Sequence, residues 1–316
     1  MNKRENVLSL LDKNRGQEYI PAGFFIHFGR DYHQGRAAID KHMEYFRYTD
    51  MDFVKIQYEN AFPRRPEIKT PDDWADMPLY KQDFYENQLN VVEGLIKEAK
   101  KEALVIMTLY SPFMCAGQTC EYGLLTEHIK ENPEKAKKGL EIVTDSLMVF
   151  VKACIKLGID GFYTSTQGGE SQRFEDVALF NECIKPFDLI LMEEINRSCN
   201  FNILHICDFN AGYSDLTTFL DYPGHVVNCS LELGSEKITG KEISRMFDRP
   251  YMGGMERKGV IASEDEDGIR KAVADNLKEA PQKYILGADC TLPDDVAWDN
   301  IKKAISIAHE YKGEKG

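Results

Sequence analysis

The segment Asn202-Ile203-Leu204-His205-Ile206-Cys207 is apolar almost throughout and ends in a thiol. Aliphatic residues that follow one another without polar alternation are typical of a strand buried on both faces, as in a parallel sheet covered by helices. A second segment, Lys283-Tyr284-Ile285-Leu286-Gly287-Ala288-Asp289-Cys290, has the same character and the same ending. We therefore predict two buried strands that each deliver a cysteine at the carboxyl end.

Six further runs of β-branched and aromatic residues resemble these two, and longer amphipathic stretches separate them. The eight predicted strands are Ala22 to Phe28, Asp52 to Tyr58, Ala103 to Leu109, Gly161 to Thr166, Asn202 to Cys207, Val226 to Leu231, Pro250 to Met255 and Lys283 to Ala288. Apolar residues at helical spacing predict helices over Glu86 to Lys101, Lys138 to Leu157, Glu264 to Glu279 and Asp294 to Tyr311.

Alternating strands and helices predict the fold class. Eight strand–helix units in a chain of 316 residues indicate a single α/β domain over residues 1–316, a (β/α)8 TIM barrel. A doubly wound open sheet is the alternative, but no Gly-x-Gly-x-x-Gly follows the first predicted strand, which argues against a dinucleotide site. Active sites of such barrels lie at the carboxyl ends of the strands, so we expect Cys207 and Cys290 to face the same mouth.

Composition and charge limit the classes of partner. The chain is 43% hydrophobic and 29% charged, and its formal net charge of -13 argues against nucleic acid and against an anionic membrane surface. The first residues are charged, and no apolar run approaches the roughly 18 residues that span a bilayer. We therefore expect a cytoplasmic protein whose eight cysteines are thiols or metal ligands rather than disulfides. A homodimer stays open as an alternative to a monomer.

His205 and Cys207 stand two residues apart on one predicted strand, so their side chains point to the same side. With Cys290 they offer one imidazole and two thiolates, which suit one zinc ion with one coordination position left open. The alternative is a core histidine beside ordinary buried thiols. Glu232, at the end of the sixth predicted strand, is the candidate for a displaceable fourth ligand, and its alternative is a solvated loop carboxylate.

This ligand set favours chemistry at a bound thiol. A free thiol, with a pKa of about 8.5, is mostly protonated at neutral pH, whereas a thiol bound to zinc is a thiolate that stays nucleophilic. Two thiolates and a neutral imidazole leave the metal electron-rich, and hydrolytic zinc sites more often use histidine and carboxylate ligands. We therefore expect the site to present a substrate thiolate to an electrophilic methyl group.

Other polar residues lie near the predicted strand ends and are candidate contacts for substrate or cofactor. Residues 55, 57 and 59 alternate along the second strand and share one side, so Glu59 is expected either to pair with Lys55 or to contact the substrate. Asp208, directly after the first thiol, is either a helix cap or an acceptor beside the metal ligands. The remaining candidates are His27, which is alternatively a core histidine, and Gln57, Tyr110 and Gln167.

Four segments together resemble the uroporphyrinogen decarboxylase superfamily, over nearly the full length of the chain. Pro21 to Tyr32, with Gly29-Arg30-Asp31-Tyr32 at its end, is similar to the first-strand signature of that superfamily. The other three segments are Leu157 to Phe162, Arg249 to Met255, and Leu286-Gly287-Ala288-Asp289-Cys290 with the stretch that follows to Ile301. The resemblance implies a (β/α)8 barrel, in agreement with the count of strands.

The superfamily has a decarboxylase branch and a methyltransferase branch. The decarboxylases hold a tetrapyrrole with arginines, an aspartate, a tyrosine and a late histidine. Of these the chain clearly retains Arg30, while Ile26, Glu59 and Ala288 stand near the places of the first arginine, the aspartate and the histidine. Decarboxylation of a tetrapyrrole is therefore the alternative function, and a non-catalytic corrinoid-binding barrel is a second alternative.

The methyltransferase branch moves a methyl group from a corrinoid protein to a thiol such as coenzyme M and binds zinc through His-x-Cys and a distant cysteine. That pattern is matched by His205, Cys207 and Cys290, and its Ser-hydrophobic-acid segment resembles Ser230-Leu231-Glu232. Cobalamin-independent methionine synthases use a similar ligand set. The resemblance thus implies a zinc-dependent methyltransferase that takes its corrinoid from a partner protein and acts on a small-molecule thiol.

Overall fold

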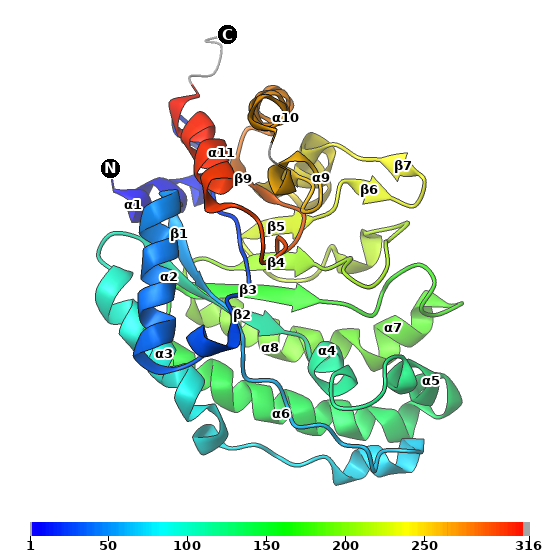
Figure 1. The fold of residues 1–316 in the computed structure, drawn as a ribbon. Helices are drawn as coiled ribbons and strands as arrows, with labels where there is room; N and C mark the ends of the chain where they lie inside the picture. The colour runs from blue at the N-terminus through cyan, green and yellow to red at the C-terminus, as the bar shows by residue number, and fades with distance from the viewer. Residues whose placement is uncertain (1, 264, 312–316) are drawn as a thin grey trace.

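The computed structural model describes residues 2–263 and 265–311 and contains one seven-stranded parallel sheet (Figure 1). The strand order is β1-β2-β3-β4-β5-β8-β9, and each strand falls on a predicted run. Seven of the eight predicted strands are thus confirmed. Their bounds are β1 (Phe53–Ile56), β2 (Leu104–Tyr110), β3 (Gly161–Thr166), β4 (Ile203–Ile206), β5 (Val226–Cys229), β8 (Tyr251–Met255) and β9 (Tyr284–Ala288).

The predicted first strand, Ala22 to Phe28, is wrong as a regular strand. Ala22 alone makes a bridge, to Leu286 of β9, and its carbonyl oxygen accepts a hydrogen bond from the N–H of Asp52, just before β1. The carbonyls of Phe24, Phe25 and Ile26 accept from groups outside the sheet, which prevents a ladder: Phe24 from the Tyr45 hydroxyl, Phe25 from the Leu292 N–H and Ile26 from the Gln57 amide. The sheet is therefore TIM-barrel-like, with a single bridge between its two edge regions.

Helices cover the outside of the sheet, and the four predicted ones correspond to α3, α6, α10 and α11 (Figure 1). The predicted start of the third, Glu264, lies outside the described residues. The helices are α1 (Lys3–Leu8), α2 (Gly35–Thr49), α3 (Glu86–Ala99), α4 (Pro112–Gly117), α5 (Leu124–Glu131), α6 (Pro133–Leu157), α7 (Val177–Cys183), α8 (Lys185–Ser198), α9 (Gly240–Phe247), α10 (Glu266–Lys278) and α11 (Trp298–Glu310).

Local sequence explains where the longest helix, α6, begins and ends. The Asn132 side chain accepts a hydrogen bond from the N–H of Lys135, and Pro133 occupies the first turn, where a missing N–H costs nothing. Gly158 ends the helix with φ of 89°, a left-handed conformation that glycine adopts without strain. These residues fix where α6 begins and ends, so the chain returns to the sheet and enters β3 in position to pair with its parallel neighbour.

The strands are buried along their length, as their apolar composition predicts. Every residue of β1, β3, β4, β5 and β9 is buried.

In the part of the chain that is described, no helix has both the length and the apolar character that crossing a bilayer requires.

The carboxyl ends of the strands share one side of the molecule. In Figure 1, β3 points toward the side where α4, α5 and α7 lie, and the other six strands of the sheet run parallel to it. On this side a short antiparallel hairpin, β6 (Glu232–Leu233) and β7 (Glu236–Lys237), follows β5. Cys207 directly follows β4 and Cys290 lies two residues beyond β9, so the fold delivers both thiols to the same end.

Candidate metal centre

His205, Cys207 and Cys290 come together although 83 residues separate the two cysteines. The two Sγ atoms lie 3.9 Å apart, and Cys290 Sγ lies 3.4 Å from His205 Nε2. The ligand atoms of the three residues are all within 4.8 Å of one another, and all three side chains are buried. Among the described residues, no other group of three or more His, Cys, Asp or Glu side chains is spaced to hold a metal ion.

The spacing of these atoms suits zinc. Tetrahedral bonds of about 2.3 Å to sulfur and about 2.0 Å to nitrogen place two sulfurs about 3.8 Å apart and a sulfur and a nitrogen about 3.5 Å apart. The observed sulfur–sulfur distance of 3.9 Å and sulfur–nitrogen distance of 3.4 Å agree with these values. His205 Nδ1, the ring nitrogen other than the one near Cys290 Sγ, is buried without a hydrogen-bond partner among the described residues.

The ring of His205 packs against a tyrosine that belongs to a hydrogen-bond network between strands. It stacks on the ring of Tyr163, with centroids 4.8 Å apart, and the Tyr163 hydroxyl donates to Asn228 Oδ1 at 2.6 Å. The amide nitrogen of Asn228 donates to the carbonyls of Met252 and Ala288 at 2.8 and 3.0 Å. This network joins β3, β5, β8 and β9 beneath the three ligands and fixes the position of the imidazole.

The two thiols differ in acidity because they share a hydrogen bond. The hydrogen bond with Cys290, together with the nearby His205, lowers the pKa of Cys207 well below its usual range. The same hydrogen bond and burial raise the pKa of Cys290. Cys207 is therefore the sulfur that loses its proton first, which prepares the pair to bind a cation.

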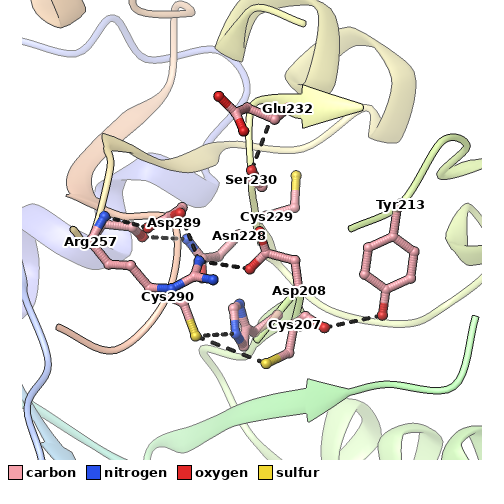
Figure 2. A network of polar contacts seen from close by, with 12 residues as sticks. Cys207, Asp208, Tyr213, Asn228, Cys229, Ser230, Glu232, Arg257, Asp289 and Cys290 are labelled. Atoms are coloured by element: carbon pink, nitrogen blue, oxygen red, sulfur yellow. Dashed lines mark hydrogen bonds and ion pairs between the residues drawn. The ribbon is translucent and has the colours of Figure 1, made fainter. Parts of the chain in front are cut away.

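Gln167, predicted as a contact at the end of the fourth strand, directly touches a ligand. Its amide nitrogen donates to Cys207 Sγ at 3.3 Å, and its amide oxygen accepts from Asn210 Nδ2 at 2.9 Å. Tyr213 also contacts Cys207, since the Tyr213 hydroxyl donates to the carbonyl of Cys207 at 3.2 Å (Figure 2). The thiolate and its backbone are thus held from two directions.

Arg257 is the contact that sequence reasoning missed. Its Nη1 donates to Asp208 Oδ1 at 2.7 Å and to Asp289 Oδ2 at 2.8 Å (Figure 2). Asp208, expected to cap a helix or to accept beside the ligands, accepts from this guanidinium beside Cys207. The only signal in the sequence is an acid beside each ligand cysteine, in Cys207-Asp208 and Asp289-Cys290.

A cavity of about 690 Å³ opens onto the three ligands and is lined by three other predicted residues, His27, Tyr110 and Gln167. His27 Nδ1 lies 3.0 Å from Glu59 Oε1, so these two predicted contact residues form a pair at the cavity. Lys55 also lines the cavity, but it donates to Gln57 Oε1 at 2.7 Å instead of pairing with Glu59. Gln57 therefore contacts the amine of Lys55 and is not among the residues that line the cavity.

The structure does not bring Glu232 or Arg30 to the three ligands. Glu232 begins β6, and its side chain is 64% exposed. Its Oε1 atom lies 3.8 Å from Lys237 Nζ, and the residue lines a different cavity of about 490 Å³. Figure 2 shows its carboxylate directed away from the two cysteines, because the chain turns into the hairpin directly after β5. Arg30 is exposed in a short turn of 3-10 helix (Arg30–Tyr32) and does not line the cavity.

Comparisons with known proteins agree with this architecture. The chain is similar to a methyltransferase from Methanosarcina mazei, with 12% identity, a TM-score of 0.74, and coverage of 98% of this chain and 99% of that one. It is also similar to a putative vitamin-B12 independent methionine synthase from Listeria monocytogenes, with 14% identity, a TM-score of 0.59, and coverage of 94% and 99%. At these identities the likeness concerns the fold.

Sequence comparison identifies the family. A uroporphyrinogen decarboxylase from Aquifex aeolicus is 20% identical over 224 residues, which cover 68% of this chain. The chain spans 63% of the length of that relative. The family model described as uroporphyrinogen decarboxylase (URO-D) matches residues 51–311. Since this match covers most of the chain, including all seven strands of the sheet and the three clustered residues, the protein belongs to the uroporphyrinogen decarboxylase family.

Proposed function

We propose that the protein is a methyltransferase that transfers a methyl group to a thiol held by one zinc ion on His205, Cys207 and Cys290. The observation that carries this proposal is the meeting of one imidazole and two thiols within 4.8 Å at one end of the sheet. A site with three protein ligands leaves one position for a substrate atom, as catalytic zinc sites do. The cavity of about 690 Å³ in front of the ligands gives that substrate room.

When bound, zinc would lower the pKa of the acceptor thiol so that it enters the reaction as a thiolate. The protein's own residues keep the site ready for it. Gln167 stabilises the charge on Cys207 through its N–H···S bond, and Tyr163 orients the imidazole of His205. His27, held by Glu59, lines the same cavity and is placed to contact the substrate.

The methyl donor in this proposal is a corrinoid carried by a partner protein. The mouth of the cavity is bordered by two exposed aromatic side chains, Tyr122 at 79% and Phe209 at 68% exposure. Large apolar side chains that remain in water at a cavity mouth are typical of a surface that another molecule covers. A donor docked there would reach the thiol through the cavity.

Decarboxylation of a tetrapyrrole is less well supported by the cavity. Binding several carboxylates requires cationic groups whose charge the protein does not already balance. Of the three arginines that line the cavity, Arg173 pairs with Glu170 and Arg257 pairs with two aspartates, while Arg64 donates to the carbonyls of Gln118 and Cys120. The resemblance to a curated decarboxylase therefore reflects common family membership, and the ligand cluster favours the methyltransferase.

The test is the metal content of protein purified without added metal or chelator. We expect about one zinc per chain in the parent protein and little in Cys207→Ser. Cys120→Ser is the matched control, because Cys120 lines the same cavity and is buried but stands outside the cluster. Methyl transfer from a methylated corrinoid to small thiols would then be assayed. A parent protein that binds no zinc after reconstitution under reducing conditions would disprove the proposal.

A further inference from the structure

Lys55 is a buried amine in the wall of the cavity. Its side chain extends from β1, is 5% exposed, and lines the same cavity as the three ligands. Nζ donates to Gln57 Oε1 at 2.7 Å and lies 4.5 and 4.9 Å from the ring centroids of Phe25 and Tyr163. Tyr163 in turn stacks on His205, so the amine and a candidate ligand contact the same aromatic ring. No ion pair of Lys55 is present among the described residues.

These surroundings favour the neutral amine. An ammonium group has three N–H donors, and burial without an anionic partner disfavours its charge. Accordingly, burial lowers the pKa of Lys55 to about 7, although Cys290, Glu59 and Cys207 act in the opposite direction. The titratable groups that face it are these three, His42 on α2, and Tyr163 on β3.

The proposed reaction needs a proton acceptor inside the cavity. A free thiol is mostly protonated near neutral pH and must lose its proton to become a metal ligand. One divalent cation with two thiolates and a neutral imidazole carries no net charge, so the incoming thiolate adds an uncompensated negative charge. One neutral amine would meet both needs. It accepts the proton and, once protonated, supplies a positive charge beside the thiolate.

We propose that Lys55 accepts the proton of the acceptor thiol and, as an ammonium ion, balances the charge of the thiolate. The inference rests on the proposed function. The S–H bond breaks, the sulfur keeps the electron pair, and an N–H bond forms at Lys55 Nζ. In the next step the sulfur takes the methyl group, the donor keeps the electron pair of the broken bond to carbon, and a neutral thioether results. Lys55 then returns its proton to solvent as the product leaves.

The pair formed by His27 and Glu59 is the rival acceptor at this cavity. Glu59 lies 3.0 Å from His27 and 3.6 Å from His33, so it is engaged by two imidazoles. The His27 side chain is 41% exposed, whereas Lys55 is 5% exposed. A proton given to His27 would exchange with solvent and leave no compensating charge beside the buried thiolate. Burial therefore favours Lys55 for both roles.

The experiment measures how thiol affinity depends on pH. Cobalt(II) replaces zinc as a spectroscopic probe, and the acceptor is 2-mercaptoethanol, a weaker acid than the cysteine thiol. It is titrated between about pH 7.5 and about pH 8.5, above the pKa of Lys55 and in the range where this thiol is largely protonated. If Lys55 keeps the proton, binding releases none, and the apparent Kd of the parent stays within about twofold over this range. In Lys55→Met the proton must leave, and the Kd should fall about tenfold per pH unit.

Lys55→Arg separates the two roles. A guanidinium keeps the positive charge but accepts no proton, so this variant should show the pH dependence of Lys55→Met with tighter binding at every pH. Circular dichroism and cobalt stoichiometry check that each variant folds and loads metal. A tenfold dependence in the parent, or a flat response in Lys55→Met, would overturn the assignment. A parent that loads cobalt but shows no spectral response to thiol would instead overturn the proposed function, and the assignment with it.

Discussion

Asp208 and Asp289 accept hydrogen bonds from the same nitrogen, Arg257 Nη1, at 2.7 and 2.8 Å (Figure 2). Each acid is the sequence neighbour of a ligand cysteine, and the side chains of all three residues are 14–16% exposed. The guanidinium therefore ties the end of β4 to the end of β9 beside the two sulfurs. We interpret Arg257 as the residue that keeps the two halves of the candidate metal centre together.

Replacing this arginine should weaken both the fold and the site. In Arg257→Met the two carboxylates remain close without their cation, and we expect the free energy of unfolding to fall by about 2 kcal/mol. Metal affinity should fall about tenfold, because the loops that carry the cysteines lose their common anchor. Chemical denaturation and competition with a chelator measure the two effects. Lys258→Met is the control, since this neighbouring cation lines the cavity but takes no part in the ion pairs of Arg257 with Asp208 and Asp289.

Loss of a ligand sulfur should remove the metal and leave the fold. Cys290 lies beyond the end of β9, so Cys290→Ser removes little from the core. We expect zinc content to fall at least tenfold and methyl transfer to be abolished, with an unchanged circular dichroism spectrum, because serine is a much poorer zinc ligand than a thiolate. Retention of both metal and activity would show that the ligands are wrongly assigned.

The hydrogen bond from Gln167 to Cys207 should contribute to metal affinity. Gln167→Leu has nearly the same shape but removes the N–H donor that lies 3.3 Å from Sγ. Losses of roughly tenfold to a hundredfold are typical when a partner of a metal ligand is removed. Competition with a zinc indicator checks this. Gln118→Leu, in the wall of the same cavity, should bind zinc like the parent, and equal losses in both variants would count against a specific role.

Glu232 should be dispensable for the metal. Its side chain is 64% exposed and is directed toward Lys237 rather than toward the cysteines, so Glu232→Gln removes no ligand in the arrangement described. We expect zinc content and affinity within about twofold of the parent, a difference of less than about 0.5 kcal/mol. A large loss of zinc would show that the hairpin folds over the site when metal binds and would restore Glu232 as the fourth ligand.

Asp188 should make stability depend on pH. This residue of α8 is buried, accepts hydrogen bonds from Thr166 and Tyr222, and has a pKa that burial raises to about 7. Because the folded pKa lies above the unfolded one, the contribution to stability is full below about pH 4 and is lost as pH rises through about 7. The total change is at most about 4 kcal/mol.

Asp188→Asn cannot ionise and tests this directly. Its stability relative to the parent should rise steadily from about pH 4 to about pH 7, because only the parent has to bury a charge at the higher pH. Urea denaturation at a series of pH values gives the difference. Asp145→Asn, at an exposed position of α6, is the control and should show no such trend. A constant difference between Asp188→Asn and the parent would show that Asp188 is ionised in the fold without penalty.

Much of the site was predictable because it depends on local pattern. His205 and Cys207 share one side of a strand because side chains alternate with a period of two. Gln167 was predicted from its place at the end of a strand, but its bond to Cys207 depends on the register of β3 and β4, which pairs Thr166 with Ile206. The predicted strand at Ala22 to Phe28 failed for a nonlocal reason, since Tyr45, Gln57 and Leu292 occupy its carbonyls.

The sequence by itself determined the seven strands of the sheet, four of the helices and the two kinds of candidate ligand, because apolar periodicity and residue chemistry are properties of short segments. Only the tertiary structure decided which side chains meet. Arg257 reaches two acids that are 49 and 32 residues away, Lys55 is buried against aromatic rings, and Glu232 turns away with its hairpin. The physical reason is that contacts across a curved sheet depend on register and packing, which no single segment encodes.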